Sequence, residues 1–412
     1  KLWVRRLTTL KTLFDVSVSS AAGIEAVTKR ELSRLGVENA PAYNGRLNFK
    51  ADLKKIAECN LYLRTANRVY IVITSFKAEN FDELFDGTFE AEWADYIPSD
   101  GKIIVSGKCV SSKLMAYSAC QSVVKKAICE KLSKKYPTLP ETGERYKVEV
   151  SVLKDFVTIS LDTTGEGLHR RGYREIVGDA PLKETVAAAL IDLSVWKPSK
   201  PFADIFCGSG TLPIESALIA SNIPAGLNRS FDFLKWKNFD TGFFGNLKDK
   251  AKSEIIQNPN VDIYGCDIDE KQLSLAKTHA FKAGVGHLIR FEKADMRDFS
   301  PSSGYGVLID NPPYGERLSD RKEIIKLYRD YGKVYSKIPT WSCYTLTSVE
   351  DFPRLFGRKV DKIRKLYNGK LECGYYSFLG EKPPRSAYNE NFGSKSDKRT
   401  DFLKENEKKL VE

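Results

Sequence analysis

The sequence predicts an α/β protein with an α+β N-terminal half and a C-terminal half built on a doubly wound, mostly parallel sheet. Three observations support this fold class. The chain has 412 residues, which is more than a single hydrophobic core usually holds. From residue 182 onward, helices and strands alternate at the spacing of βαβ units. Before that point, alternating apolar strands are interleaved with amphipathic helices.

The N-terminal half shows four successive patterns. Residues 14–36 predict a strand and an amphipathic helix, and residues 45–76 predict a strand, a helix and a long β-branched strand. Residues 113–137 form a helical pattern with a lysine-rich end. Residues 146–162 predict two strands with Asp155 at the turn between them. This order of elements is typical of an α+β region.

The C-terminal half follows a Gly- and Arg-rich connector, residues 164–181. A hairpin with an Asn-Gly turn is expected within residues 362–380, at one edge of the sheet. From about residue 381 the chain is polar and predicts a disordered tail. The parallel strands are expected near residues 201–206, 262–267, 289–292, 306–309 and 342–347.

Composition excludes some classes of protein. The 42% hydrophobic and 29% charged residues are typical of a soluble, cytoplasmic protein, and no apolar run has membrane-spanning length. Eight cysteines without a CxxC pair, and three histidines without nearby ligands, predict no disulfide framework and no metal site. The net charge of +11 favours a polyanionic partner such as nucleic acid.

A glycine loop follows the first strand of the C-terminal half, in FADIFCGSGTLPIES. Gly208 and Gly210 allow a tight turn and a close approach of the backbone to a ligand at the next helix. Pro213 replaces the third glycine of a dinucleotide fingerprint, and no P-loop lysine follows. Asp204 precedes the loop, where an acid repels phosphates but pairs with a cation. The ligand is therefore expected to carry an ammonium or sulfonium group, as S-adenosylmethionine does.

Further acids follow the next two strands. Asp267 ends the second strand, where a carboxylate can accept both ribose hydroxyls. Asp269 is expected mainly to cap the next helix. Asp295 follows the third strand and is placed to accept from an adenine amine. A helix cap or an ordinary loop carboxylate is the alternative for each acid, but their occurrence after three successive strands favours a nucleoside site.

The stretch LIDNPPYGERL follows the fourth strand. Proline cannot continue a sheet ladder, so a rigid loop begins at Asp310 or Asn311. The Asn311 side chain and the carbonyl of Pro312, held by Pro313, can accept both hydrogens of an exocyclic amine and direct its lone pair at a methyl carbon. Tyr314 offers a face for stacking a planar target. Positioning, without a cysteine nucleophile, is the expected source of catalysis.

The segments DIFCGSGT, GCDID, AD and DNPPYGERL, in this order, resemble the amino-methyltransferases that use S-adenosylmethionine and an NPPY motif. This resemblance covers the C-terminal half and implies a Rossmann-like fold with Asn311, Pro312, Pro313 and Tyr314 as the catalytic loop. Leu182, Lys183, Glu184 and Thr185 become candidates for contacts near the methionine end. The residues expected to bind the cofactor are Asp204, Phe206, Cys207, Gly208, Ser209, Gly210, Thr211, Asp267, Ile268, Asp295, Met296, Asp310 and Asn311.

The connector and the N-terminal half resemble RNA methyltransferases with a THUMP domain and a preceding ferredoxin-like part. The expected domains are 13–60 (ferredoxin-like), 61–166 (THUMP), 167–380 (methyltransferase) and 381–412 (tail). The resemblance implies a bacterial enzyme that methylates the exocyclic amine (N2) of a guanine in large-subunit 23S ribosomal RNA. The basic side chains expected to hold RNA phosphates are Lys125, Lys126, Lys131, Lys134, Lys135, Arg170, Arg171 and Arg174.

Three alternatives remain open. The same NPPY geometry serves a glutamine amide in a protein, although the large basic N-terminal half argues against that substrate. Adenine N6 methylation of RNA or DNA is the second, and no separate region for reading duplex sequence is evident. The third is an assembly factor that binds RNA or cofactor without catalysis, which the complete NPPY loop disfavours.

Overall fold

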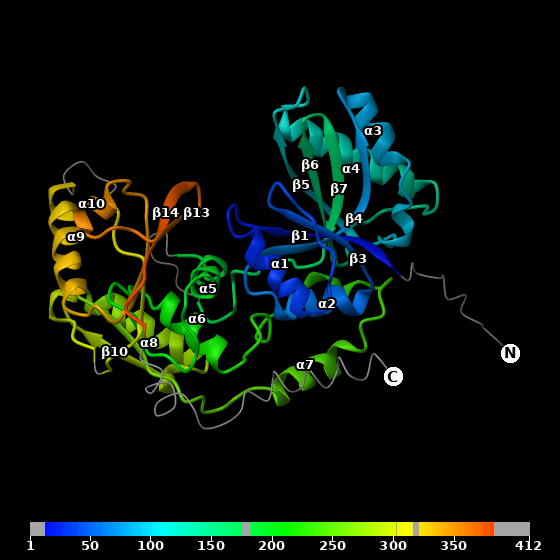
Figure 1. The fold of residues 1–412 in the computed structure, drawn as a ribbon. Helices are drawn as coiled ribbons and strands as arrows, with labels where there is room; N and C mark the ends of the chain where they lie inside the picture. The colour runs from blue at the N-terminus through cyan, green and yellow to red at the C-terminus, as the bar shows by residue number, and fades with distance from the viewer. Residues whose placement is uncertain (1–12, 175–181, 302, 316–320, 383–412) are drawn as a thin grey trace, which may run out of the picture.

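Two seven-stranded sheets organise the chain and lie side by side (Figure 1). The structure is a computed structural model that describes residues 13–174, 182–301, 303–315 and 321–382. The first sheet has the strand order β2-β3-β1-β4-β7-β6-β5, and the second has the order β10-β9-β8-β11-β12-β14-β13. The expected change from an α+β half to a doubly wound half is therefore confirmed.

The first sheet is antiparallel except for the parallel pair β5 and β6. β4 joins its two parts, because it pairs with β1 on one side and with β7 on the other. Lys154 and Asp155 both have positive φ at the β6–β7 turn, which is the backbone of a tight hairpin. The elements are β1 Phe14–Ser20, α1 Glu25–Arg34, β2 Ala42–Tyr43, β3 Arg46–Ala51, α2 Leu53–Tyr62, β4 Ala66–Lys77, α3 Phe81–Phe89, η1 Trp93–Asp95, β5 Lys102–Val110, α4 Tyr117–Ser133, β6 Arg145–Leu153 and β7 Phe156–Asp162.

The second sheet is parallel from β10 to β12, and the hairpin of β14 and β13 closes it in antiparallel pairing. All five expected parallel strands and the expected edge hairpin are present. The elements are α5 Glu184–Leu193, β8 Phe202–Asp204, α6 Thr211–Ala220, η2 Asp232–Lys235, α7 Phe244–Ser253, β9 Ile263–Asp267, α8 Glu270–Lys282, η3 Gly286–Leu288, β10 Ile289–Lys293, η4 Met296–Asp298, β11 Val307–Asp310, α9 Arg321–Ser336, β12 Ser342–Thr347, α10 Phe352–Phe356, β13 Lys362–Asn368 and β14 Leu371–Phe378.

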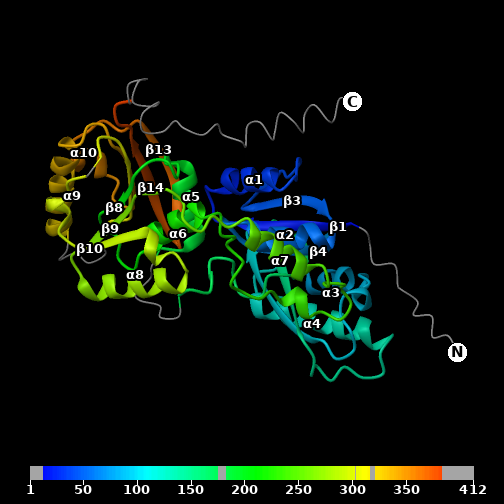
Figure 2. The same ribbon diagram turned by 90° about the horizontal axis from the view of Figure 1, so that it is seen from below.

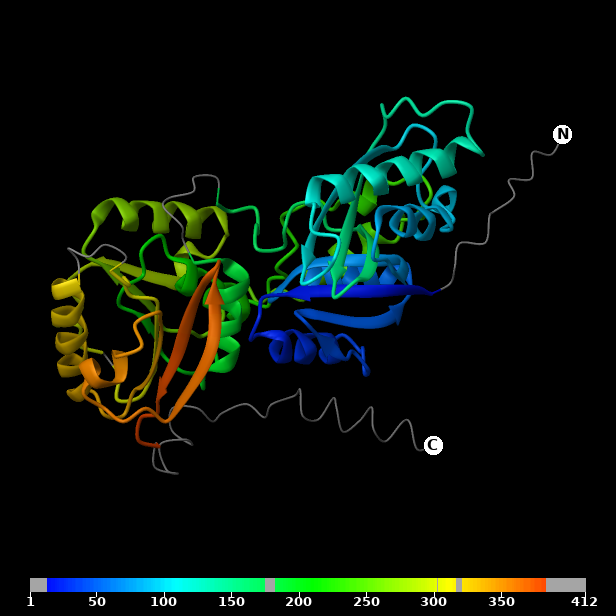
Figure 3. The same cartoon turned by 90° about the horizontal axis from the view of Figure 1, so that it is seen from above.

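Helices cover both faces of the second sheet (Figure 3). Successive strand residues face opposite sides, so Phe202 packs with α5 and α6 whereas Ala203 packs with α9 and α10. Val307 and Leu308 divide between the same two cores. Burial on both faces explains why these strands are continuous apolar runs instead of alternating ones.

A segment of the second half completes the core of the first. Phe231, Phe233, Trp236 and Phe244 lie between α6 and β9 in sequence, yet they pack in the core of the first sheet. Trp236 stacks on Tyr146 at 5.1 Å between ring centroids. α7 lies beside α2, as two views show (Figure 1, Figure 2). The order of elements along the sequence did not indicate that this segment packs against the first sheet.

Within the described residues, no helix is both long enough and apolar enough to cross a bilayer.

Candidate active site

Two buried carboxyl groups meet at the carboxyl ends of the adjacent parallel strands β8 and β11. Asp310 has no exposed surface and Asp204 is 2% exposed. Asp310 Oδ1 accepts a hydrogen bond from the Ile205 amide at 2.8 Å, and Asp204 Oδ1 accepts one from the Phe206 amide at 3.1 Å. The Tyr331 hydroxyl donates to Asp310 Oδ2. These hydrogen bonds therefore hold both carboxyl groups in place at the strand ends.

Burial changes the protonation of this pair. Desolvation raises the pKa of Asp310 to about 7, although the Tyr331 hydroxyl and the Ile205 amide oppose the shift. Desolvation, and then the charge of Asp310, raise the pKa of Asp204 well above its usual value. Two carboxyls in contact share a proton more easily than they hold two charges. The role of Asp204 toward a cationic group stays a prediction, and a nearby cation would favour its ionised form.

The glycine loop has the backbone that the sequence predicted. Gly208 and Gly210 have φ of +49° and +83°, and Gly210 is the N-cap of α6. A Cβ on Gly210 would lie 2.9 Å from Ala276 Cβ of α8, so this position admits no side chain. A Cβ on Gly208 would meet no atom within 4 Å. Open space beside a half-buried turn at a helix N-terminus fits a ligand that approaches the backbone closely.

Asp267 holds the glycine loop in place. Its Oδ2 accepts from the Gly208 amide and its Oδ1 accepts from the Asp269 amide, both at 2.9 Å. Asp269 caps α8 by accepting from the Lys271 amide at 2.8 Å, which confirms the predicted cap. The carboxyl of Asp267 thus lies beside Gly208, where a ribose is expected, and its ligand contact stays a prediction.

The loop after β10 is built around Asp295. Its carboxylate accepts from the Arg297 amide at 2.9 Å and pairs with the Arg297 guanidinium at 2.8 Å, so it caps the short helix η4. Asp295 therefore has the helix-capping role that the sequence left open as the alternative to ligand binding. The side chain of Met296 is buried in the core, which leaves its backbone for any ligand. Ile268, by contrast, is 68% exposed and free to contact an apolar ring.

The NPPY loop leaves the sheet directly after Asp310. The Tyr314 hydroxyl donates to Asn311 Oδ1, the oxygen that is expected to accept an amine hydrogen. Tyr314 is partly buried and packs against the core that contains α5. An amide oxygen can accept two hydrogen bonds, so a planar amine can donate to the Asn311 oxygen beside this hydroxyl or in its place.

Two tyrosines that lie outside the sequence motifs support this loop. The Tyr328 hydroxyl donates to the Pro313 carbonyl at 2.9 Å and is 2.8 Å from Thr347 Oγ1. Tyr331 reaches Asp310 from the same face of α9, three residues further along. Their three-residue spacing could be read from the sequence. Aromatic residues at this spacing on a helix usually mark the face that packs on the core, so the sequence did not indicate a role at the site.

The structure corrects two of the RNA-binding predictions. Arg171 is 4% exposed and forms a bidentate pair with Glu215, with Nε–Oε1 at 3.1 Å and Nη2–Oε2 at 3.3 Å. The side chain of Arg174 is 9% exposed and pairs with Glu184 at 3.2 Å. Both guanidiniums are buried and each is paired with a carboxylate inside the protein, so neither lies where an RNA phosphate could reach it.

The other basic side chains remain candidates for RNA binding. Arg170 has an exposed side chain, 3.6 Å from Glu166. Lys125 pairs with Glu141 at 2.9 Å, and Lys134 lies 4.3 Å from the ring centroid of Phe89. Of the remaining lysines in this group, Lys126 and Lys135 are exposed, whereas Lys131 is half-buried and pairs with Glu92 at 3.0 Å.

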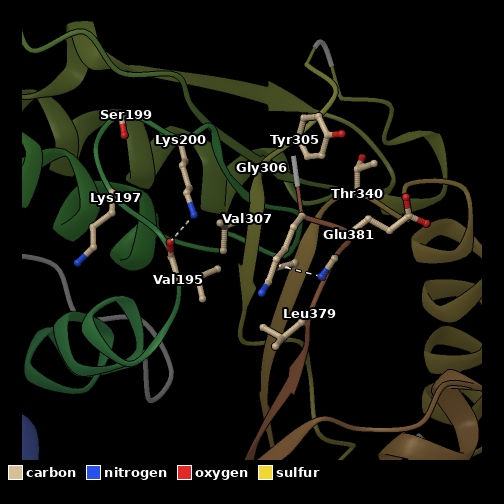
Figure 4. Close-up of a pocket in the computed structure, with 13 residues that line it drawn as sticks. Val195, Lys197, Ser199, Lys200, Tyr305, Gly306, Val307, Thr340, Leu379 and Glu381 are labelled. Atoms are coloured by element: carbon tan, nitrogen blue, oxygen red, sulfur yellow. Dashed lines mark hydrogen bonds between the residues drawn. The ribbon is translucent and has the colours of Figure 1, made fainter. Parts of the chain in front are cut away.

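An apolar cavity of about 830 Å³ lies at the opposite edge of the second sheet (Figure 4). Gly306 and Ser342 line it at the amino ends of β11 and β12, and the Lys200 ammonium donates to the Val195 carbonyl at 3.1 Å. Doubly wound sheets bind their ligands at the carboxyl ends of the strands. This cavity is therefore separate from the candidate active site. The described residues contain no group of His, Cys, Asp and Glu that could hold a metal ion.

A Rossmann-like sheet with a glycine loop, an acid after the second strand and an NPPY loop defines the S-adenosylmethionine-dependent methyltransferases as the class of this protein. Comparison with known families agrees. Residues 171–377 match the RMKL-like methyltransferase domain, residues 15–70 the RlmL ferredoxin-like domain and residues 78–162 the THUMP domain.

Similar proteins extend over nearly the whole chain. "Putative RNA methyltransferase YpsC" of Bacillus subtilis (strain 168) is 43% identical over 386 residues, covering 92% of this chain and 99% of the relative. The crystal structure of "SMU.472, a putative methyltransferase complexed with SAH" is 41% identical with a TM-score of 0.86, covering 91% and 100% of the two chains. A "predicted N6-adenine-specific DNA methylase" of Listeria monocytogenes str. 4b F2365 is 45% identical with a TM-score of 0.85, covering 90% and 97%.

The chain therefore belongs to the RMKL-like methyltransferase family, with ferredoxin-like and THUMP domains ahead of the catalytic domain. S-adenosylmethionine is its cofactor. The open space beside Gly208 and the carboxyl of Asp267 fit this cofactor.

Proposed function

We propose that this protein methylates the exocyclic N2 amine of a guanine in ribosomal RNA, with 23S RNA of the large subunit as the substrate. The observation that carries the proposal is the position of Asn311. Its side-chain oxygen lies directly after the buried strand end at Asp310 and already accepts one hydrogen bond, from the Tyr314 hydroxyl. An aromatic amine that replaces this hydroxyl would donate to the same oxygen.

The NPPY loop is suited to an amine that is a weak nucleophile. The nitrogen lone pair of a base amine is delocalised into the ring, and two fixed acceptors that bind its hydrogens localise that pair. Asn311 Oδ1 and the Pro312 carbonyl are the acceptors we assign. Tyr328 fixes the Pro313 carbonyl, so the loop does not have to reorganise when the amine arrives. S-adenosylmethionine supplies an electrophilic methyl group on a sulfonium.

The N-terminal half supports RNA as the substrate. It carries the ferredoxin-like and THUMP domains, the arrangement of the RNA methyltransferases that the N-terminal half resembles. The related B. subtilis protein is named as an RNA methyltransferase. The net charge of +11 and the exposed side chains of Lys126, Lys134 and Lys135, on α4 and just after it, favour binding to phosphates. A base must be splayed out of its stack to reach the loop after β11.

The test is a comparison of ribosomal RNA from cells with and without the gene. RNA fragments are digested to nucleosides and analysed by mass spectrometry. Loss of one N2-methylguanosine from 23S RNA, restored by the native gene and not by an Asn311→Ala copy, is the expected result. Loss of a methyladenosine would transfer the assignment to adenine N6. An unchanged RNA profile with loss of methylglutamine from a protein would overturn the RNA substrate.

A further inference from the structure

Arg174 has an unusual set of partners for a buried arginine. Its Nη1 pairs with Glu184 Oε1 at 3.2 Å, and its Nη2 donates to Thr211 Oγ1 at 2.5 Å. Its Nε is buried and has no hydrogen-bond partner among the residues that the structure describes. A buried N–H group that has lost its hydrogen bonds to water and gained no protein partner costs free energy of folding. This nitrogen therefore requires an explanation.

The unpaired Nε belongs to the edge of the guanidinium that recognises carboxylates. Nε–H and Nη2–H point in parallel and match the two oxygens of one carboxylate. Arg171, three residues earlier, shows this edge filled, because its Nε and Nη2 both donate to Glu215. On Arg174 the same edge holds only a hydroxyl. Arg174 thus has the donor geometry of Arg171 without the carboxylate.

This edge faces the loop that binds the cofactor. Thr211 is the first residue of α6 and directly follows Gly210, the left-handed N-cap. The helix N-terminus adds unpaired backbone amides and a positive dipole end at the same place. The ring of His279, from α8, contacts the Ser209 carbonyl at 3.2 Å and so supports the other side of the loop. An anion here would be bound by both the arginine and the helix end.

Glu184 controls the direction of this guanidinium. It is the first residue of α5 and is buried, with 3% of its surface exposed. It takes Nη1, which is not part of the carboxylate-binding edge, and so leaves Nε and Nη2 turned toward α6. Glu184 therefore acts as a positioning residue for Arg174.

We propose that Arg174 binds the α-carboxylate of the methionine part of S-adenosylmethionine through its Nε and Nη2 atoms. The carboxylate replaces the Thr211 hydroxyl on Nη2 and satisfies the unpaired Nε. This assignment concerns the cofactor only and does not depend on whether the methyl acceptor is guanine, adenine or an amide.

The test compares two ligands that differ in the amino-acid group. S-adenosylhomocysteine carries the carboxylate, whereas 5′-methylthioadenosine keeps the adenosine and thioether but lacks the amino-acid part. Calorimetry or competition binding on the full-length protein gives both dissociation constants. In Arg174→Lys, which keeps a cation beside Glu184 but loses the parallel edge, affinity for S-adenosylhomocysteine should fall at least about 10-fold. Affinity for 5′-methylthioadenosine should stay within about twofold, inside the scatter of such measurements.

A second variant covers the case in which an unpaired Glu184 prevents folding. The double variant Arg174→Met with Glu184→Gln removes both charges together, and it should show the same selective loss. Arg354→Met is the matched control, because this exposed arginine of α10 pairs with Asp351 on the surface, away from the glycine loop. Equal losses for both ligands in folded variants would mean that Arg174 is purely structural, and unchanged affinity for S-adenosylhomocysteine would also overturn the proposal.

Discussion

The carboxyl groups of Asp204 and Asp310 are buried beside each other at the adjacent ends of β8 and β11, where the charge of Asp310 helps to raise the pKa of Asp204. Each is the last residue of its strand, and each is buried. One lies before the glycine loop and the other before the NPPY loop. The pair therefore connects the cofactor loop to the catalytic loop, and the charge at this connection depends on pH.

The first prediction concerns the pH dependence of stability. An unfolded Asp has a pKa near its usual value of 3.8, whereas folding raises the pKa of Asp310 to about 7. Between these values the folded protein holds a proton that the unfolded chain has lost. The free energy of unfolding should therefore fall as pH rises through this window, with a slope approaching about 1.4 kcal/mol per pH unit. Denaturant unfolding at several pH values measures it. Asp310→Asn should flatten the slope, and an unchanged slope would assign it to another group.

The second prediction separates cofactor affinity from the chemical step at Asp204. We expect Asp204→Ala to weaken the binding of S-adenosylhomocysteine, because the carboxyl that is expected to accept from the cationic end of the ligand is lost. Calorimetry on the native protein and on the variant checks it. Equal affinities would refute the assignment of Asp204 to the cofactor.

The third prediction concerns catalysis by the NPPY loop. Asn311→Ala should lower kcat by about 100-fold or more, since it removes a fixed acceptor for the amine, and should leave cofactor affinity nearly unchanged. Tyr314→Phe keeps the stacking face and loses only the hydroxyl that donates to Asn311. It should retain much more activity than Asn311→Ala. Methyl transfer from labelled cofactor to ribosomal RNA measures both, and a larger loss in Tyr314→Phe would contradict the role of the ring.

The fourth prediction uses two neighbouring acids as a matched pair. Asp267→Ala should weaken S-adenosylhomocysteine at least about 10-fold, because the Gly208 amide loses its acceptor and the ribose loses its expected one. Asp269→Ala should leave this affinity intact and cost about 1 kcal/mol of stability as a lost cap. Calorimetry and thermal unfolding distinguish the two. Similar affinities for both variants would remove Asp267 from the cofactor site.

The fifth prediction concerns the segment that returns to the first sheet. Trp236 is 2% exposed, and its indole donates to the Arg145 carbonyl at 2.9 Å. Trp236→Ala should cost about 3–5 kcal/mol through the cavity it leaves. Affinity for S-adenosylhomocysteine at a temperature where the variant is folded should not change, because the site lies on the other sheet. Ile256→Ala, at a 51% exposed position, is the control for stability.

Much of the fold could be predicted because its signals are local. Apolar runs located the five parallel strands, and turn residues located the hairpin around Gly369. The Asp269 cap followed from its place before a helix. The loops after β8, β9, β10 and β11 could be assigned to one edge because parallel strands end on the same side.

The sequence by itself determined the architecture of the second half, the glycine loop and the NPPY loop, since periodicity and turn residues act over a few neighbouring positions. The tertiary structure alone decided that Arg171 and Arg174 are internal, that Trp236 belongs to the first core, and that Tyr328 and Tyr331 support the catalytic loop. It also decided that Asp204 and Asp310 are buried beside each other, which raises the pKa of both carboxyls. These features depend on which distant residues exclude water from one another, and spacing along the chain does not encode that.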